Sequence, residues 1–324
     1  MRTSLLALSL ALTGSALAAS MPTTLATGGL TLHGTLETPD TPAPWPAVLI
    51  VAGSGPTDRD GNSAGLPGAN DSLKQLAQGL ARQGIASVRY DKRGIGQSVP
   101  TSGPALREEN LVFGDFVNDA AAWVRQMKAD PRFAGVGVIG HSEGALIALA
   151  VANDAPVGAV VTLAGAGENL SDVLKRQIRA NPANPPELVA EVDRILAELS
   201  AGRRVASVPP VLAPLFRPSV QPFLISAFQY DPAQLIGTVK APVLIVQGDA
   251  DLQVTPDDAR RLAAANPQAE LRLIPGMNHV LKQVGHDLTL NQRSYGDPTV
   301  PLSPALLPAA APFLKSRLTQ TSAP

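Results

Sequence analysis

The 324-residue sequence contains no cysteine, which excludes disulfide bonds, a cysteine nucleophile and thiolate-bound metal sites. It also has no excess of either charge, since 27 acidic residues stand against 26 lysines and arginines. This balance argues against nucleic acid or an anionic membrane as the main partner. Hydrophobic residues make up 45% of the chain, so it can bury a large core, either as one α/β domain with an insertion or as two domains.

The first eighteen residues match the pattern of a secretory signal peptide. Arg2 supplies the positive charge, Leu5 to Leu12 form a short apolar core, and Ala16-Leu17-Ala18 is a small-x-small cleavage site. The apolar core is well short of the ~20 residues that span a bilayer, and a lipoprotein anchor would require a cysteine. We therefore expect a mature protein that begins near Ala19 and is exported to the periplasm or the medium, without a stable membrane anchor.

Residues 136–150 combine an apolar strand-like run, a break at Gly140-His141-Ser142-Glu143-Gly144 and an apolar helix-like run. A serine at the apex of so tight a turn is strained, and its neighbours must lack a side chain for strand and helix to pack closely. The helix would direct its first N–H groups at the space beside Ser142, where negative charge develops when a serine attacks a carbonyl. The pattern therefore indicates that Ser142 is a nucleophile.

The same glycine-x-serine-x-glycine pattern occurs a second time, at Gly61-Asn62-Ser63-Ala64-Gly65. This copy follows a polar run at 57–60 and precedes Leu66-Pro67-Gly68, so it has neither the strand nor the helix that a nucleophile turn requires. We interpret it as a loop.

The turn Gly53-Ser54-Gly55-Pro56 ends a buried strand at 47–52. Its small residues would let backbone N–H groups approach a ligand. We expect the Ser54 N–H to be one donor of an oxyanion hole and the Glu143 N–H, directly after the serine, to be the other. The alternative is an ordinary glycine turn with no role in binding.

The acidic run after this turn superficially resembles the start of a calcium loop. Asp58, Asp60 and Asn62 have the right spacing, but glycine falls at the wrong place and no glutamate closes a twelve-residue loop. We expect no metal ion here and no cofactor in the protein.

Strand-like and helix-like segments alternate along the sequence. Residues 30–37 alternate apolar and polar side chains with the period of a half-buried strand, which places His33 on the polar face. Helical patterns run from Ser72 to Gly84 and from Phe113 to Met127. Apolar runs indicate buried strands at 47–52, 136–140, 157–163 and 242–247. We also expect strands at 85–90 and 271–275. This alternation predicts an α/β fold, a mostly parallel sheet with helices on both faces.

Residues 167–240 interrupt the alternation. They contain amphipathic helical patterns, for example at residues 188–199, separated by proline-rich links such as Pro209-Pro210, and no evident strand. Inserted between two sheet strands on the side where Ser142 opens, the segment is expected to form a helical cap over the site. The alternative is a helical pack on the flank of the sheet without contact to substrate. The expected domains are a signal peptide at 1–18, a core at 19–166 and 241–324, and the cap at 167–240.

Two further candidate site residues follow strands later in the chain. Asp251 lies in the loop Gly248–Val254 after a buried strand, and an acid at the carboxyl end of a strand is well placed to orient a histidine. His279 lies in the loop after the next strand. The order serine, acid, histidine, each on a loop after a strand, is the order found in α/β hydrolases.

The chain resembles the α/β-hydrolase superfamily across nearly all of the expected mature sequence. Within it, the chain is similar to bacterial carboxylesterases with a GHSEG nucleophile turn, relatives of the serine aminopeptidase-like branch. The matching motifs are Val51–Asn62, Asp91–Ser98, Gly140–Gly144, Gly248–Val254 and Asn278-His279. The chain departs from the common pattern at Ala52, where many members have histidine, and this departure leaves Ser54 or Gly53 open as the first oxyanion donor.

The resemblance implies that Ser142 is the nucleophile, Asp251 the orienting acid and His279 the general base. It also implies a serine hydrolase with an inserted cap. The alternatives to these residues are Asp249 and Asp287 for the acid and His286 for the base.

We expect the substrate to be a carboxylic ester of short to medium acyl chain, because an ester site needs mainly an apolar cleft beside the catalytic residues. The alternatives are a serine aminopeptidase or amidase, a thioesterase, and a non-catalytic binding protein on the same fold. The stretch 209–222, with five prolines and Arg217, would make a stiff cover rather than a lipase lid. The cap offers apolar candidates for the cleft at Leu212, Leu215, Phe216, Phe223, Leu224, Ile225 and Phe228, and acidic candidates for an ammonium site at Glu168, Asp172 and Glu187.

Overall fold

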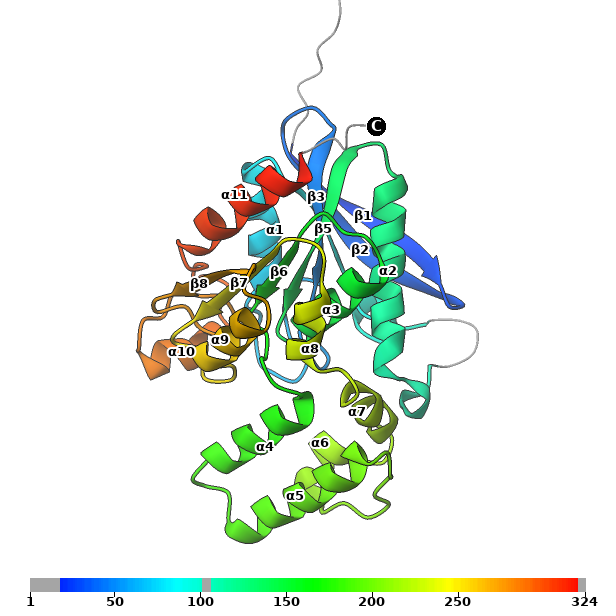
Figure 1. Ribbon diagram of the computed structural model, residues 1–324, viewed down its shortest axis with the longest axis vertical. Coiled ribbons are helices and arrows are strands. Elements are labelled where there is room, and N and C mark those ends of the chain that lie inside the picture. The colour runs from blue at the N-terminus through cyan, green and yellow to red at the C-terminus, as the bar shows by residue number, and fades with distance from the viewer. Residues whose placement is uncertain (1–17, 101–105, 320–324) are drawn as a thin grey trace, which may run out of the picture.

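The computed structural model describes residues 18–100 and 106–319 (Figure 1). Nearly all of the expected signal peptide lies outside the described residues. Eight strands form one sheet in the order β1-β2-β4-β3-β5-β6-β7-β8. The pairs β1–β2 and β2–β4 are antiparallel, and every other neighbouring pair is parallel. The strands are β1 (Ala19–Thr27), β2 (Leu30–Thr38), β3 (Trp45–Val51), β4 (Ala86–Tyr90), β5 (Phe133–His141), β6 (Val160–Leu163), β7 (Val243–Gly248) and β8 (Glu270–Ile274).

Helices cover both faces of the sheet because its central strands are apolar on both sides. In β3, Ala47 and Leu49 face one helical layer while Val48 and Ile50 face the other, and all four are fully buried. One layer consists of α2 (Phe113–Ala129), α3 (Glu143–Asp154), α8 (Pro232–Thr238) and α9 (Pro256–Ala265), and the other of α1 (Ser72–Arg82) and α11 (Leu306–Leu318). This arrangement confirms the fold class expected from the sequence.

Between β6 and β7 the chain leaves the sheet and forms a separate helical group at one end of the molecule (Figure 1). Its elements are α4 (Leu170–Ala180), α5 (Pro186–Ser200), the short helix η3 (Pro210–Leu212), α6 (Ala213–Phe216) and α7 (Gln221–Ala227). These helices share an apolar cluster of their own, which includes Val192, Ile195, Phe216 and Leu224. Helix α8 is different, because it packs on α3 and α9 and contributes Ile236 to the core cluster. We call α4 to α7 the cap.

Strand β1 was not anticipated from the sequence. It pairs with β2 along its whole length, and the two strands are joined at Gly28-Gly29, where φ is 54° and 76°. A two-residue turn with positive φ at both positions matches the twist of a hairpin, and glycine adopts it without strain. Only Leu25 of β1 is buried, so the strand has no apolar alternation by which it could be recognised.

Three more short elements complete the description. They are η1 (Gly96–Ser98), η2 (Glu108–Asn110) and α10 (Leu288–Ser294). None of the helices in the described ranges is both long and apolar enough to span a bilayer. Within the same ranges, no group of three or more histidine, aspartate or glutamate side chains is arranged to hold a metal ion.

Candidate active site

Ser142 lies at the turn between β5 and α3 with φ 56° and ψ −120°. A non-glycine residue in such a region costs ~1–3 kcal/mol and persists only where the surroundings enforce it. The flanking glycines permit the turn, because a side chain on Gly140 would collide with the backbone of Gly144, and one on Gly144 with the backbone of Val51. The turn therefore presents Ser142, half-buried, at the end of the sheet. The second glycine-x-serine-x-glycine match, residues 61–65, lies in a loop, as expected.

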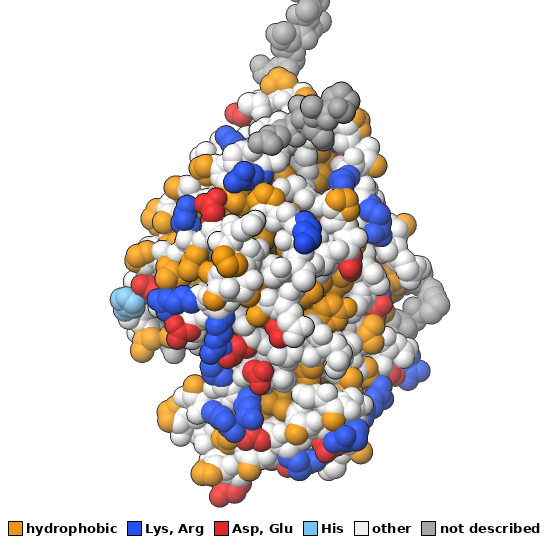
Figure 2. Space-filling view, in the orientation of Figure 1, with side chains coloured by type: hydrophobic (Ala, Val, Ile, Leu, Met, Phe, Trp, Pro, Cys, Tyr) orange, Lys and Arg blue, Asp and Glu red, His pale blue; other side chains and the backbone are white. Residues whose placement is uncertain are grey.

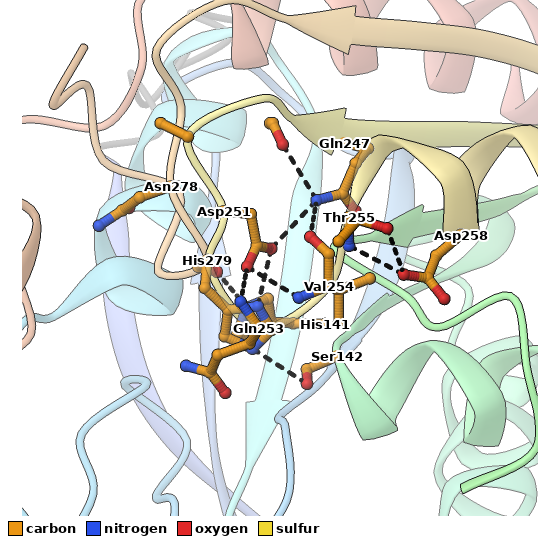
Figure 3. A network of polar contacts seen from close by, with 12 residues as sticks. His141, Ser142, Gln247, Asp251, Gln253, Val254, Thr255, Asp258, Asn278 and His279 are labelled. Atoms are coloured by element: carbon orange, nitrogen blue, oxygen red, sulfur yellow. Dashed lines mark hydrogen bonds and ion pairs between the residues drawn. The ribbon is translucent and has the colours of Figure 1, made fainter. Parts of the chain in front are cut away.

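The structure brings Ser142, His279 and Asp251 into one hydrogen-bonded line (Figure 3). His279 Nδ1 lies 2.8 Å from Asp251 Oδ2, and His279 Nε2 lies 3.1 Å from Ser142 Oγ. A carboxylate can only accept, so Nδ1 carries the hydrogen and Nε2 is left to accept from the serine hydroxyl. The side chains of Asp251 and His279 are 0% and 7% exposed.

Asp251 is held by four donors (Figure 3). Its Oδ1 accepts from the backbone N–H groups of Gln253 (2.8 Å) and Val254 (3.0 Å), and its Oδ2 accepts from Gln247 Nε2 (3.0 Å) besides His279. Burial favours the neutral acid, but His279 and the two backbone donors outweigh it and keep the pKa of Asp251 below its ordinary value. Asp251 is therefore a fixed anion at neutral pH.

His141, next to Ser142, is bonded to the loop that carries His279. Its Nε2–H donates to the backbone carbonyl of His279 at 2.7 Å, and the two rings lie 5.1 Å apart. Burial, reinforced by the neighbouring His279, lowers the pKa of His141 to about 4. His141 is therefore neutral at pH 7 and acts as a buried hydrogen-bond donor.

The loops that carry the acid and the histidine are tied together through α10. Asn278, fully buried, donates to Asn291 Oδ1 (3.0 Å) and Ser294 Oγ (2.7 Å). Asn291 in turn donates to the carbonyl of Ala250, next to Asp251, at 2.9 Å. One helix thus sets the spacing between the two loops.

The alternative residues have other partners in the structure. Asp249 accepts from the Gly276 N–H at 2.6 Å, and Asp287 caps α10 by accepting from the N–H groups of Thr289 and Leu290. His286 is exposed. None of these three, all within the described ranges, hydrogen-bonds to Ser142 or His279.

Three residues of this site were not identified from the sequence, namely His141, Gln247 and Asn291. Gln247 carried a usable signal, because a polar side chain at the end of an otherwise apolar strand needs buried partners. His141 and Asn291 bond to groups 138 and 41 residues away, and no local pattern encodes such distant partners.

The turn after β3 lies directly beside Ser142. A side chain on Gly53 would come within 3.2 Å of Ser142 Cβ and 3.4 Å of His141 Nδ1, so only glycine leaves the required space. In the described part of the chain, the N–H groups of Ser54 and Glu143 have no protein acceptor. Both residues line the cavity at Ser142 and leave their N–H groups available to a ligand.

A cavity of about 130 Å³ opens beside Ser142 between core and cap. Its apolar walls come from Phe113, Leu146, Leu170, Val173, Leu174 and Val254. The cap residues expected to line the cleft do not line this cavity. Most of them belong to the apolar cluster inside the cap, where Ile225 packs against the buried Leu212, Phe216, Leu224 and Phe228. Leu215 is exposed. Phe223 borders a second cavity of about 530 Å³ on the far side of Glu143. The apolar face of α4 supplies the wall instead.

The chain matches a family model described as serine aminopeptidase, S33, over residues 65–207. The match includes the turn at Ser142 but stops before Asp251 and His279. The chain is also 27% identical over 253 residues to the esterase EstD of Thermotoga maritima, covering 77% of this chain and 58% of EstD. It thus spans less than two thirds of the length of that relative.

Solved structures that are similar over almost the whole chain include Est1E and GrgF. Est1E from Butyrivibrio proteoclasticus, bound to ferulic acid, has a TM-score of 0.60 at 17% identity, over 92% of this chain and 100% of Est1E. The α/β hydrolase GrgF from Penicillium sp. sh18 has a TM-score of 0.57 at 20% identity, over 93% of this chain and 100% of GrgF. At these identities the likeness concerns the fold.

Proposed function

We propose that this chain is a member of the α/β-hydrolase superfamily and a serine esterase that cleaves short- to medium-chain carboxylic esters through an acyl-enzyme. The observation that carries the proposal is the line from Ser142 Oγ through His279 to Asp251, at 3.1 and 2.8 Å, beside an apolar cavity. The sequence relation to an esterase supports the same activity.

The proposed reaction has two halves. Ser142 Oγ attacks the ester carbonyl carbon while its proton passes to His279 Nε2, and Asp251 stabilises the imidazolium that forms. The tetrahedral intermediate collapses as His279 gives the proton to the leaving alcohol oxygen, which leaves an acyl group on Ser142. Water then attacks the acyl carbon, His279 takes its proton, and Ser142 recovers a proton as the carboxylic acid departs.

Negative charge on the carbonyl oxygen needs donors in both halves. The N–H groups of Ser54 and Glu143 are available beside Ser142, and the second also lies at the N-terminus of α3, where the helix dipole favours an anion. We assign these two groups as the oxyanion hole. No metal or cofactor enters this mechanism.

Charge pairing around the cavity favours an ester over an aminoacyl amide. An aminopeptidase must bind a free ammonium group with an unpaired carboxylate. Glu168 lines the cavity but contacts Arg176 at 3.1 Å and also Arg261, and Glu143 is bound by Lys92 at 2.9 Å. Both carboxylates at the cavity are therefore already neutralised. Asp172 and Glu187 do not line it.

The size of the cavity favours a short acyl group. At about 130 Å³ the cavity beside Ser142 is smaller than the roughly 300–1,000 Å³ of pockets that hold a drug-sized ligand. A butyryl chain fits this space, whereas a palmitoyl chain would have to extend out of it.

A hydrolysis panel tests the proposal. We expect kcat/KM for p-nitrophenyl butyrate to exceed that for p-nitrophenyl palmitate, for a butyryl thioester and for aminoacyl p-nitroanilides. Faster cleavage of an aminoacyl amide than of any ester would replace the esterase with a peptidase, and faster cleavage of the thioester would replace it with a thioesterase.

Export of the protein is part of the proposal. The motivation is the apolar core at Leu5–Leu12 followed by the small-x-small site Ala16–Ala18. N-terminal sequencing of protein from its native host should find a mature chain that begins near Ala19 in the periplasm or the medium. A chain that retains Met1 in the cytoplasm would contradict it.

A further inference from the structure

Lys92, two residues after β4, is a buried cation between the two turns that face Ser142. Its ammonium group donates to the Gly53 carbonyl at 2.5 Å and to Glu143 Oε1 at 2.9 Å. The side chain is 3% exposed and lies 5.7 Å from the centre of the Phe116 ring. A single lysine thus contacts Gly53, whose carbonyl shares a peptide group with the Ser54 N–H, and Glu143, whose own N–H is the other candidate oxyanion donor.

The contact with Gly53 determines where the Ser54 N–H points. The Gly53 carbonyl and the Ser54 N–H belong to one peptide group, which is planar and trans, so its C=O and N–H are antiparallel. Once Lys92 binds the carbonyl, the N–H must point to the opposite side. The positive charge also polarises the peptide and makes its N–H a stronger donor.

The contact with Glu143 removes an unfavourable charge. The Glu143 side chain is only 10% exposed and belongs to the residue that supplies the second oxyanion donor. Without a counter-charge, a carboxylate at this position would oppose the negative charge that develops on the substrate oxygen, because repulsion between like charges is strong in a poorly solvated site. Lys92 cancels it.

We propose that Lys92 is a positioning residue that orients the Gly53–Ser54 peptide and neutralises Glu143, so that both oxyanion donors act on the transition state. This inference rests on the ester hydrolysis proposed above. Lys92 itself does not touch the reacting atoms.

The substitution Lys92→Met tests the role, since it removes the charge and keeps most of the apolar stem. Deletion of one oxyanion donor lowers kcat about 10²- to 10³-fold, and Lys92 acts through the donors, so we expect a loss of roughly 10- to 100-fold in kcat with KM within about threefold. Affinity for phenylboronic acid, which forms a tetrahedral anion on a nucleophilic serine, should fall by a similar factor.

Lys282→Met is the matched control. Lys282 is also buried, and its ammonium also donates to one backbone carbonyl, that of Val300, and to one side-chain oxygen, Gln75 Oε1, both at 2.8 Å. It contacts neither oxyanion turn, so its loss should lower the melting temperature while kcat and boronate affinity stay within about threefold of the parent.

An unchanged kcat in folded Lys92→Met, an unchanged boronate affinity, or equal losses in Lys282→Met would overturn the proposal. If Lys92→Met does not fold, the same measurements are made on Lys92→Gln, which keeps a neutral hydrogen-bond donor. We then expect an intermediate loss of kcat and of boronate affinity. The boronate titration needs no substrate. A protein that cleaved no ester would therefore contradict the proposed esterase activity, while the effect of Lys92→Met on boronate affinity could still be measured.

Discussion

Among single residues, Ser142 has the most direct test. Ser142→Ala removes the proposed nucleophile on the turn between β5 and α3, and we expect kcat to fall by about 10⁴-fold or more, with the fold intact. Circular dichroism and a p-nitrophenyl butyrate assay check both parts.

Ser63→Ala is the control for this change, because Ser63 has the same flanking pattern but lies in a loop. Its activity should match the parent. Near-parental turnover in Ser142→Ala would contradict the assignment of Ser142 as the nucleophile, and loss of turnover in Ser63→Ala would favour Ser63 instead.

Substitutions of Asp251 and Asp249, both in the loop after β7, test which of the two is the acid that orients His279. Asp251→Asn removes the anion that fixes the tautomer of His279, so we expect kcat to fall roughly 10³- to 10⁴-fold. Asp249→Asn keeps a carbonyl oxygen that can accept from the Gly276 N–H and removes only the charge, so it should change kcat much less. Steady-state kinetics of both variants decide the matter, and the reverse order would assign the role to Asp249.

At the scale of elements, ion pairs attach the cap to the core near the cavity. Arg176 of α4 binds Asp258 of α9 through both carboxylate oxygens, at 2.8 and 2.9 Å. Glu108 of η2 binds Arg217 and Ser219 of the cap on the other side. Because α4 forms a wall of the cavity, the position of the cap sets the shape of the acyl site.

Arg176→Met should loosen α4 without touching the catalytic residues. We expect KM for p-nitrophenyl butyrate to rise roughly three- to tenfold, with a smaller change in kcat, because the change acts on substrate binding. Stability should also fall, by about 1–3 kcal/mol, because the arginine is one third exposed but its partner Asp258 is 1% exposed and would stay buried without its cation.

Arg194→Met provides the comparison, because Arg194 pairs with Glu191 on the exposed face of α5, away from the cavity. Its KM should equal that of the parent. A parental KM in Arg176→Met would show that this ion pair does not shape the acyl site.

At the scale of the whole molecule, His141 makes stability depend on pH. In the folded protein its pKa is about 4, against an ordinary value of 6.5. As pH falls below about 6.5, the unfolded chain binds a proton that the folded chain does not bind until about pH 4, so stability falls with pH across this window. At ~1.4 kcal/mol per pH unit, the loss amounts to about 3 kcal/mol.

Urea unfolding of the parent and of His141→Gln between pH 4 and 7 measures this loss. The difference between the two curves isolates His141, because the carboxylates titrate in both proteins. The difference in unfolding free energy between the parent and His141→Gln should shrink steadily toward low pH. His286→Gln, which removes an exposed histidine, should keep the parental slope, and parallel curves for the parent and His141→Gln would rule out a neutral buried His141.

The fold class and the position of Ser142 on a tight strand-to-helix turn could be predicted from the sequence because both depend on local rules. Apolar periodicity identifies strands and helices, and the glycines around Ser142 mark a turn that tolerates no side chain. The loop after β7 was also recognisable, but its local pattern offers two aspartates, and only the family resemblance favoured Asp251 over Asp249. Asp249 turns to Gly276 and Asp251 to His279, and that difference depends on where the next strand ends.

Only the tertiary structure decided which distant groups meet. Lys92 reaches Gly53 and Glu143, 39 and 51 residues away, and the acyl cavity is walled by α4 rather than by the more apolar α7. A buried side chain finds its partners through the packing of strands and helices against each other, and a short sequence window contains only one side of each contact. Local sequence therefore determines where a reactive residue stands, whereas packing determines what surrounds it.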